Sequence, residues 1–188
     1  MVTADLCRDV AMEAARRGAR VNVHELWALL EDLSDVQPRL IVDIGSGPAV
    51  WWAWWSLCPD VIGVSPVVEQ VQPAFSGVAL PSNVVPLVAD PRDASTVLRV
   101  ADQVARRPVD ALVISGAGDA DTARWLFHSY APHVREGGMV IVHGIADPST
   151  PGVATFWRAL EGETRELIGA EHPDGYGIVT VPRKVSHG

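Results

Sequence analysis

The sequence predicts an α/β protein with a doubly wound, seven-stranded sheet that is mostly parallel and ends in an antiparallel hairpin. Two observations predict this class. Short apolar runs alternate along the chain with stretches of helical spacing, and such alternation gives a parallel sheet with helices on both faces. Near the C-terminus, two further apolar runs flank one turn, which is typical of an antiparallel hairpin.

The chain begins with a helical pattern and continues with five apolar runs. Helices are expected over residues 3–17 and 23–33, with Gly18 as the break and Pro38 leading into the first strand. Nearly continuous apolar runs are typical of strands buried on both faces. Such strands are expected at 39–45, 60–65, 83–90, 109–116 and 137–144.

Helices are expected between these strands, covering both faces of the sheet. They occupy residues 49–57, a short stretch after Pro66, and residues 94–106 and 119–134. A further helix starts at Pro151, and strands over 164–170 and 175–182 then flank a turn at 171–175. We expect one domain over residues 1–188, with N-terminal helices in 1–36 and the sheet core in 37–188.

The charge balance narrows the class of partner. Acidic residues outnumber basic ones 23 to 15, giving a formal net charge of −8, which argues against nucleic acid or an anionic membrane as partner. No apolar run reaches the length of about 20 residues that a membrane span needs. The start of the chain lacks the apolar core of a signal peptide and there are only two cysteines, so we expect a cytoplasmic protein.

A glycine turn follows the first predicted strand, in the sequence "DIGSGPA" of residues 43–49. In an open α/β sheet the ligand lies beyond the carboxyl ends of the strands and touches this turn. The third glycine of the dinucleotide motif is replaced by Val50, and no Gly-Lys-Ser/Thr sequence follows. The turn therefore predicts a site for another ligand, with an ordinary tight turn as the alternative.

With this turn, the chain resembles the class I S-adenosylmethionine-dependent methyltransferases over nearly its whole length. The likeness is strongest in "YAPHVREGGMVIVHGI", "PGVATFWRAL" and "GYGIVTV", which are similar to the small-molecule and sugar O-methyltransferases and the cephalosporin-hydroxylase-like group. The resemblance implies a Rossmann-like fold, S-adenosylmethionine as cofactor, and O-methylation of a small-molecule acceptor.

The resemblance also assigns site residues. The methionine part of the cofactor would contact Asp43, Gly45, Ser46, Gly47 and Ala49. It places Ser65 at the ribose position, where the family usually has an acid, and Asp90 near the adenine; Ser115 and Gly116 complete the implied cofactor site. A serine makes one neutral hydrogen bond where a carboxylate makes two stronger ones. Ser65 would also suit the N-cap of a helix that begins at Pro66, and the two roles are compatible.

Metal-using relatives carry carboxylates after the fourth and fifth strands, as Mg²⁺ requires. Here the matching positions hold the sequence "SGAG" of residues 115–118 and the pair His143-Gly144. We therefore expect no catalytic metal. Asp119 and Asp121 follow closely, but their position at a helix start favours a capping role.

His143 is the candidate catalytic residue. It ends the fifth predicted strand, and an imidazole at the carboxyl edge of the sheet can accept a proton from an acceptor hydroxyl. A structural histidine at a strand end is the alternative.

Four tryptophans follow the glycine turn. Trp51, Trp54 and Trp55 share one side of the expected helix, whereas Trp52 points elsewhere. Most should pack in the core, and any that do not would form either a wall of the binding pocket or a contact in a homodimer.

Three functions remain open, and a small-molecule methyltransferase is the first. The second is a catalytically silent relative that binds a nucleoside or acts as an assembly partner, because Ser65, Ser115 and Gly144 stand where the family has carboxylates. The third is a dinucleotide-dependent oxidoreductase, which Val50 and Ser65 disfavour.

Overall fold

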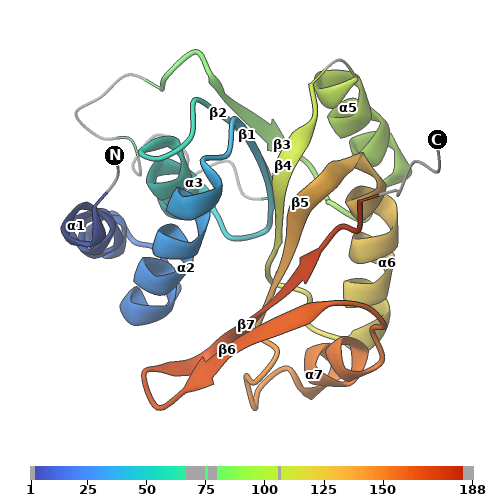
Figure 1. The fold of residues 1–188 in the computed structure, drawn as a ribbon. Coiled ribbons are helices and arrows are strands. Elements are labelled where there is room, and N and C mark those ends of the chain that lie inside the picture. The colour runs from blue at the N-terminus through green and yellow to red at the C-terminus, as the bar shows by residue number, and fades with distance from the viewer. Residues whose placement is uncertain (1–2, 67–74, 76–79, 106, 184–188) are drawn as a thin grey trace.

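The computed structural model describes residues 3–66, 75, 80–105 and 107–183, and these form a seven-stranded mixed sheet between two helical layers (Figure 1). The strand order is β3-β2-β1-β4-β5-β7-β6. The strands are β1 (Leu40–Ile44), β2 (Asp60–Ser65), β3 (Val84–Val88), β4 (Val109–Ile114), β5 (Val134–His143), β6 (Thr164–Gly169) and β7 (His172–Thr180). The first five are parallel, and β7 is antiparallel to both β5 and β6. The predicted fold class is confirmed.

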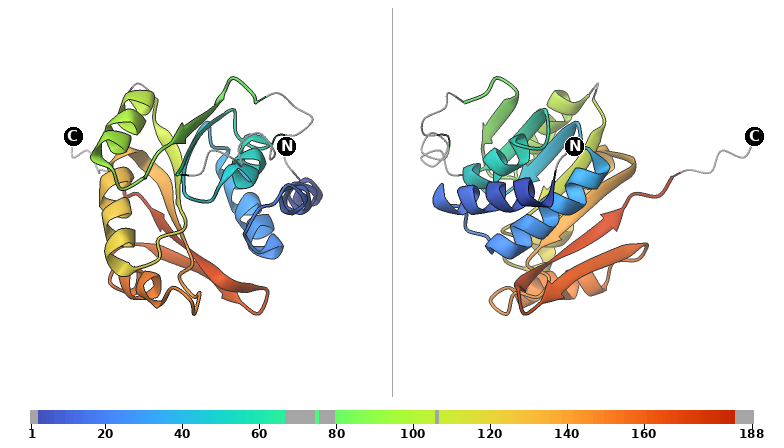
Figure 2. Two further views of the ribbon diagram at one scale, coloured as in Figure 1. Left: turned by 180° about the vertical axis from the view of Figure 1, so that it is seen from behind. Right: turned by 60° about the vertical axis from the view of Figure 1, so that its left-hand side comes forward.

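Each face of the sheet is covered by its own set of helices, as the two views of Figure 2 show. One layer consists of α1 (Ala4–Arg16), α2 (Val23–Val36) and α3 (Pro48–Trp55). The other consists of α5 (Ala94–Val104), α6 (Ala120–Tyr130) and α7 (Pro151–Arg158). Two separate apolar cores result, one under each layer, as the doubly wound architecture requires.

Local chemistry fixes most helix starts. Asn22 accepts hydrogen bonds from the first amides of α2 through Oδ1, and Asp119 does the same for α6. The capping role expected for Asp119 is thus confirmed. The helix expected after Pro66 lies outside the described residues.

Several sequence-based boundaries differ from the structure, and two of these differences have a clear physical reason. The helix expected over 119–134 ends at Tyr130, because a short 3₁₀ turn over Ala131–His133 leads directly into β5. The turn expected at 171–175 is also misplaced: β7 already begins at His172. Proline, aspartate and glycine in this segment form an irregularity inside the strand instead, where the register with β6 shifts between the Leu167–Tyr176 and Gly169–His172 pairs.

None of the helices in the described part of the chain is both long and apolar enough to cross a membrane.

Candidate active site

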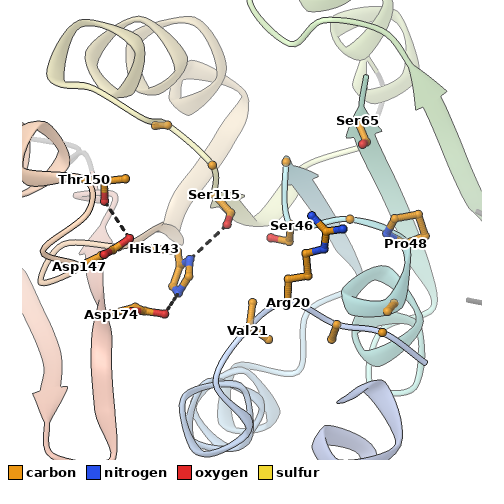
Figure 3. Close-up of a pocket in the computed structure, with 18 of the residues that line it drawn as sticks. Arg20, Val21, Ser46, Pro48, Ser65, Ser115, His143, Asp147, Thr150 and Asp174 are labelled. Carbon is orange, nitrogen blue, oxygen red and sulfur yellow. Dashed lines mark hydrogen bonds and ion pairs between the residues drawn. The ribbon is translucent and has the colours of Figure 1, made fainter. Parts of the chain in front are cut away.

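A cavity of about 750 Å³ opens at the carboxyl ends of β1, β2, β4 and β5 (Figure 3). Its walls are the α1–α2 connection, the glycine turn after β1, the ends of β2 and β5 with the residues that follow them, the residues after β4, and Asp174 of β7. This is the position that the glycine turn predicted, since ligands of open α/β sheets bind where parallel strands end.

Eight of the ten residues predicted for the site line this one cavity. They come from four different strand ends and are Gly45, Ser46, Gly47, Ala49, Ser65, Ser115, Gly116 and His143. The two that do not line the cavity are Asp43 and Asp90.

Asp43 lies behind the glycine turn, with no exposed surface. Its Oδ1 accepts hydrogen bonds from the Ser46 amide at 3.1 Å and from Trp51 Nε1 at 3.0 Å, and its Oδ2 accepts one from Trp54 Nε1 at 2.6 Å. Burial raises the pKa of Asp43 to about 6, although the three donors act in the opposite direction. In this structure, Asp43 shapes the turn from the core side and does not face the ligand space.

The hydrogen bonds to Asp43 also explain the positions of the tryptophans of α3. Trp51 and Trp54 are fully buried, and the Trp51 ring lies against Gly63 of β2, where a Cβ atom would come within 2.2 Å of it. Trp52 and Trp55 are partly buried against the same core. None of the four lines the cavity, so the pocket-wall alternative was wrong for them.

Asp90 belongs to a separate, shallower hollow with Arg92, Asp93, Asp121, Thr122 and Trp125. Its Oδ1 accepts a hydrogen bond from the Arg92 amide at 2.8 Å, and its Oδ2 lies 3.6 Å from the Arg92 guanidinium. The structure therefore does not bring Asp90 together with the glycine turn.

The two glycines of the turn differ in what surrounds them. Both have a positive φ, 92° for Gly45 and 91° for Gly47, a region that side chains other than glycine rarely adopt. A Cβ on Gly45 would lie 2.3 Å from the carbonyl oxygen of Ser115, whereas a Cβ on Gly47 would meet nothing within 4 Å. Gly45 thus packs the turn onto the end of β4, and Gly47 borders open space in the cavity.

His143 is held from both ring nitrogens. Its Nδ1 lies 3.2 Å from Ser115 Oγ, and its Nε2 lies 3.3 Å from Oε2 of Glu25 and 3.9 Å from Oδ2 of Asp174. The ring also lies 4.7 Å from that of the buried Tyr176, centroid to centroid. Nothing in the sequence connects Glu25 with His143, 118 positions later.

Glu25 is a fully buried carboxylate. Besides His143, it meets the amides of Asp174 and Gly175, which donate hydrogen bonds to Oε1 at 2.8 and 2.9 Å. Burial acts to raise the pKa of Glu25, but the hydrogen bonds from His143 and the two amides outweigh it, so the pKa is lowered. Glu25 is therefore ionised at neutral pH.

The chain matches solved structures but no known sequence family. No protein-family model and no curated protein sequence matches the chain. Among solved structures, the MycE methyltransferase of the mycinamycin biosynthetic pathway, in complex with Mg, SAH and mycinamycin VI, superposes with a TM-score of 0.66 at 15% identity over 96% of this chain. The O-methyltransferase TomG from Streptomyces achromogenes, in complex with SAM, gives 0.65 at 19% identity over 97% of this chain and 92% of its own. An rRNA methylase from Streptococcus thermophilus gives 0.62 at 14% identity over 85% of this chain and 97% of its own.

The chain has the class I methyltransferase fold. It spans 56% of the MycE chain, a little over half. At identities this low the likeness establishes the fold, and chemistry must be argued from the site.

Within this methyltransferase fold, charge is unevenly distributed around the cavity. Arg20 lies on the side of the glycine turn, while Asp147 and Asp174 lie beside His143 on the opposite side (Figure 3), and Arg17 also lines the cavity. Arg17 Nε donates a hydrogen bond to Glu13 Oε1 at 3.0 Å, and the Arg17 guanidinium lies 4.4 Å from the centroid of the Trp52 ring. The sequence analysis missed both arginines, because only the tertiary arrangement brings the α1–α2 connection to the strand ends.

One group in the described residues has the composition of a metal site. The ligand atoms of Glu25, His143 and Asp174 lie within 4.8 Å of one another. Glu25 Oε1 already accepts two amide hydrogen bonds, however, and Oε2 is within hydrogen-bonding distance of His143 Nε2. We interpret the group as a hydrogen-bonded set, because Glu25 already has three hydrogen-bond partners among the described residues and Oε1 uses both of its lone pairs on the two amides.

Proposed function

We propose that the protein is an S-adenosylmethionine-dependent methyltransferase that methylates an oxygen of a small-molecule acceptor without a metal ion. One observation carries the proposal: a single cavity joins the open glycine turn to a histidine that is hydrogen-bonded at both nitrogens. The glycine turn supplies a surface for the cofactor, and the histidine supplies a base for the acceptor.

The shape and charge of the cavity suit the cofactor. The space beside Gly47 is free of side chains, so a ligand can approach the backbone closely. The guanidinium of Arg20, on the side of the glycine turn, suits the carboxylate of the methionine part. Ser65, 6% exposed at the end of β2 and part of the lining, suits a ribose hydroxyl. When bound, the cofactor supplies an electrophilic methyl group.

Three observations favour a small-molecule oxygen as the acceptor. The net charge of −8 and the acidic side chains beside His143 disfavour a nucleic acid as the acceptor, because its phosphate backbone is negatively charged. MycE was solved with mycinamycin VI, and TomG is involved in tomaymycin synthesis. His143 is placed to accept a proton, which a hydroxyl must lose on methylation. The positions immediately after β4 and β5, where metal-using relatives carry carboxylates, hold Ser115-Gly116-Ala117-Gly118 and Gly144 in this chain, which favours transfer without a metal ion.

Calorimetric titration in buffer containing EDTA tests this function. We expect S-adenosylmethionine and S-adenosylhomocysteine to bind, and NAD to give no heat of binding, because Val50 replaces the glycine that the dinucleotide motif needs. Binding only after addition of Mg²⁺ would contradict metal independence. Tight binding of NAD would favour an oxidoreductase, and binding of neither cofactor would favour the silent relative.

Replacement of Ser65 by aspartate tests the ribose position. We expect Ser65→Asp to bind S-adenosylhomocysteine about fivefold to tenfold more tightly, since a charged acceptor adds about 1 kcal/mol net of its desolvation. Calorimetry measures the change, with Ser65→Ala as the control that removes the hydroxyl. Equal or weaker binding by Ser65→Asp would rule out the ribose assignment, and Glu69, which lies outside the described residues, would be the next candidate.

A further inference from the structure

We propose that Glu25, His143 and Ser115 form a proton relay, in which the Ser115 hydroxyl meets the acceptor and Glu25 acts as a positioning residue that fixes the tautomer of His143. The catalytic role of this relay rests on the proposed methyl transfer. The relay itself is inferred from two hydrogen bonds, which connect the buried Glu25 through His143 to Ser115 in the cavity lining.

The tautomer of His143 follows from its neighbours. Nε2 faces two carboxylate oxygens, Glu25 Oε2 at 3.3 Å and Asp174 Oδ2 at 3.9 Å. An ionised carboxylate can only accept hydrogen bonds, so Nε2 must carry the proton. The neutral ring then has its lone pair on Nδ1, and Ser115 Oγ, 3.2 Å away, donates to it.

Glu25 cannot easily turn away from the ring. Its other oxygen accepts both the Asp174 and Gly175 amides, which lie where the β6–β7 register shifts. The carbonyls of the same two residues accept hydrogen bonds from Ala146 and Gly144, directly after His143. The irregularity in β7 therefore fixes the carboxylate and the end of the histidine strand at once.

Carboxylates lie close to the His143 ring on one side. Glu25 faces it from α2, Asp174 and the Tyr176 ring from β7, and Asp147 lies on the same side of the cavity. The pKa of Asp174 is raised by burial and by Glu25. A buried carboxylate beside an imidazolium compensates its charge.

Because Ser115 Oγ occupies the lone pair of Nδ1 and also lines the cavity, the proton can travel through it. The acceptor hydroxyl gives its proton to Ser115 Oγ as Ser115 gives its own to His143 Nδ1. The acceptor oxygen forms a bond to the methyl carbon as the sulfur–carbon bond of the sulfonium breaks. One positive charge disappears at sulfur and one appears on the imidazole ring, so charge is balanced.

Glu25→Gln tests whether Glu25 fixes the tautomer of His143. The Asp174 and Gly175 amides both donate to the Oε1 position, so this position must remain a hydrogen-bond acceptor. The glutamine carbonyl must stay there, which turns its NH₂ group toward Nε2. Nε2 then becomes the acceptor, and the ring proton moves to Nδ1. We expect long-range ¹H–¹⁵N NMR at mildly alkaline pH to show the Nε2–H tautomer in the parent and the Nδ1–H tautomer in Glu25→Gln.

The matched control is Glu31→Gln, on the same helix, where Glu31 accepts a hydrogen bond from Trp27 away from the cavity. It should keep the parent tautomer. An unchanged tautomer in folded Glu25→Gln would overturn the positioning role. A shift of the Nε2 signal on addition of Mg²⁺ or Zn²⁺ would make the group a metal site and overturn the relay.

Ser115→Ala tests the serine itself. We expect the Nδ1 signal to shift as its hydrogen bond is lost, while the affinity for S-adenosylhomocysteine stays within about threefold of the parent. A loss of affinity beyond tenfold would make the hydroxyl a cofactor contact and overturn its role in the relay. If even the parent binds no cofactor, the proposed function fails, but the NMR result still decides whether Glu25 fixes the tautomer.

Discussion

Asp43→Ala should lower the free energy of unfolding by about 2–4 kcal/mol. Removal of the carboxylate leaves two indole N–H groups and the Ser46 amide without their acceptor, at about 1–3 kcal/mol for each buried donor. Relief from burying the charge offsets part of this loss. Urea denaturation measures the difference.

The control for Asp43→Ala is Asp93→Asn, an exposed N-cap whose side chain accepts from the Ser95 amide. Asparagine caps helices as well as aspartate does, so a change below about 0.5 kcal/mol is expected. If Asp43→Ala loses less than about 1 kcal/mol, the indole bonds to Asp43 do not hold α3 to the sheet.

The raised pKa of Asp43 gives this variant a pH dependence. The folded state binds the proton more tightly than the unfolded state, with a pKa of about 6 against 3.8. The stability contributed by Asp43 is therefore greatest below pH 4 and declines as the pH rises through 6. The difference between parent and Asp43→Ala should be larger at pH 4.5 than at pH 7.5.

Much of the fold could be predicted from local sequence because strand and helix periods are local properties. The apolar runs of β1, β2 and β4 and the turn "DIGSGPA" place the cavity before any tertiary contact is known. The turn expected at 171–175 failed for a physical reason. Proline, aspartate and glycine favour a β-bulge as well as a turn, and the choice depends on Glu25, which takes the Asp174 and Gly175 amides.

The candidate site was less predictable than the fold. Backbone positions such as Gly47 follow from the turn, but the direction of a side chain depends on its partners. Asp43 points into the core because Trp51 and Trp54, eight and eleven residues later, present indole N–H groups to it. Glu25 reaches His143 only because α2 packs beside β7, and no local pattern encodes that contact.

The two glycines of the turn are not equivalent as tests of cofactor binding, although the sequence suggests that either would serve. A side chain at Gly45 would collide with the Ser115 carbonyl at 2.3 Å, so a variant there would disturb the junction of β1 and β4. Binding lost through such damage says nothing about the ligand. Gly47, with open space around it, is the informative position.

Gly47→Val should abolish binding of S-adenosylhomocysteine, with a loss of at least about 100-fold, or ~2.7 kcal/mol. The new side chain would enter the space beside the turn, where the ligand must approach the backbone. Gly47 has a φ of 91° and a ψ of 166°, a region that only glycine adopts readily and that adds strain of about 1–3 kcal/mol for another residue, so binding must be compared with a variant at a second glycine of positive φ. Gly162→Val is the control, because Gly162 also has a positive φ, of 122°, with free space for a Cβ and no part in the cavity lining. Calorimetry should find parent-like affinity in Gly162→Val and none in Gly47→Val, with both folded by circular dichroism. Parent-like affinity in a folded Gly47→Val would show that the cofactor does not lie on the glycine turn.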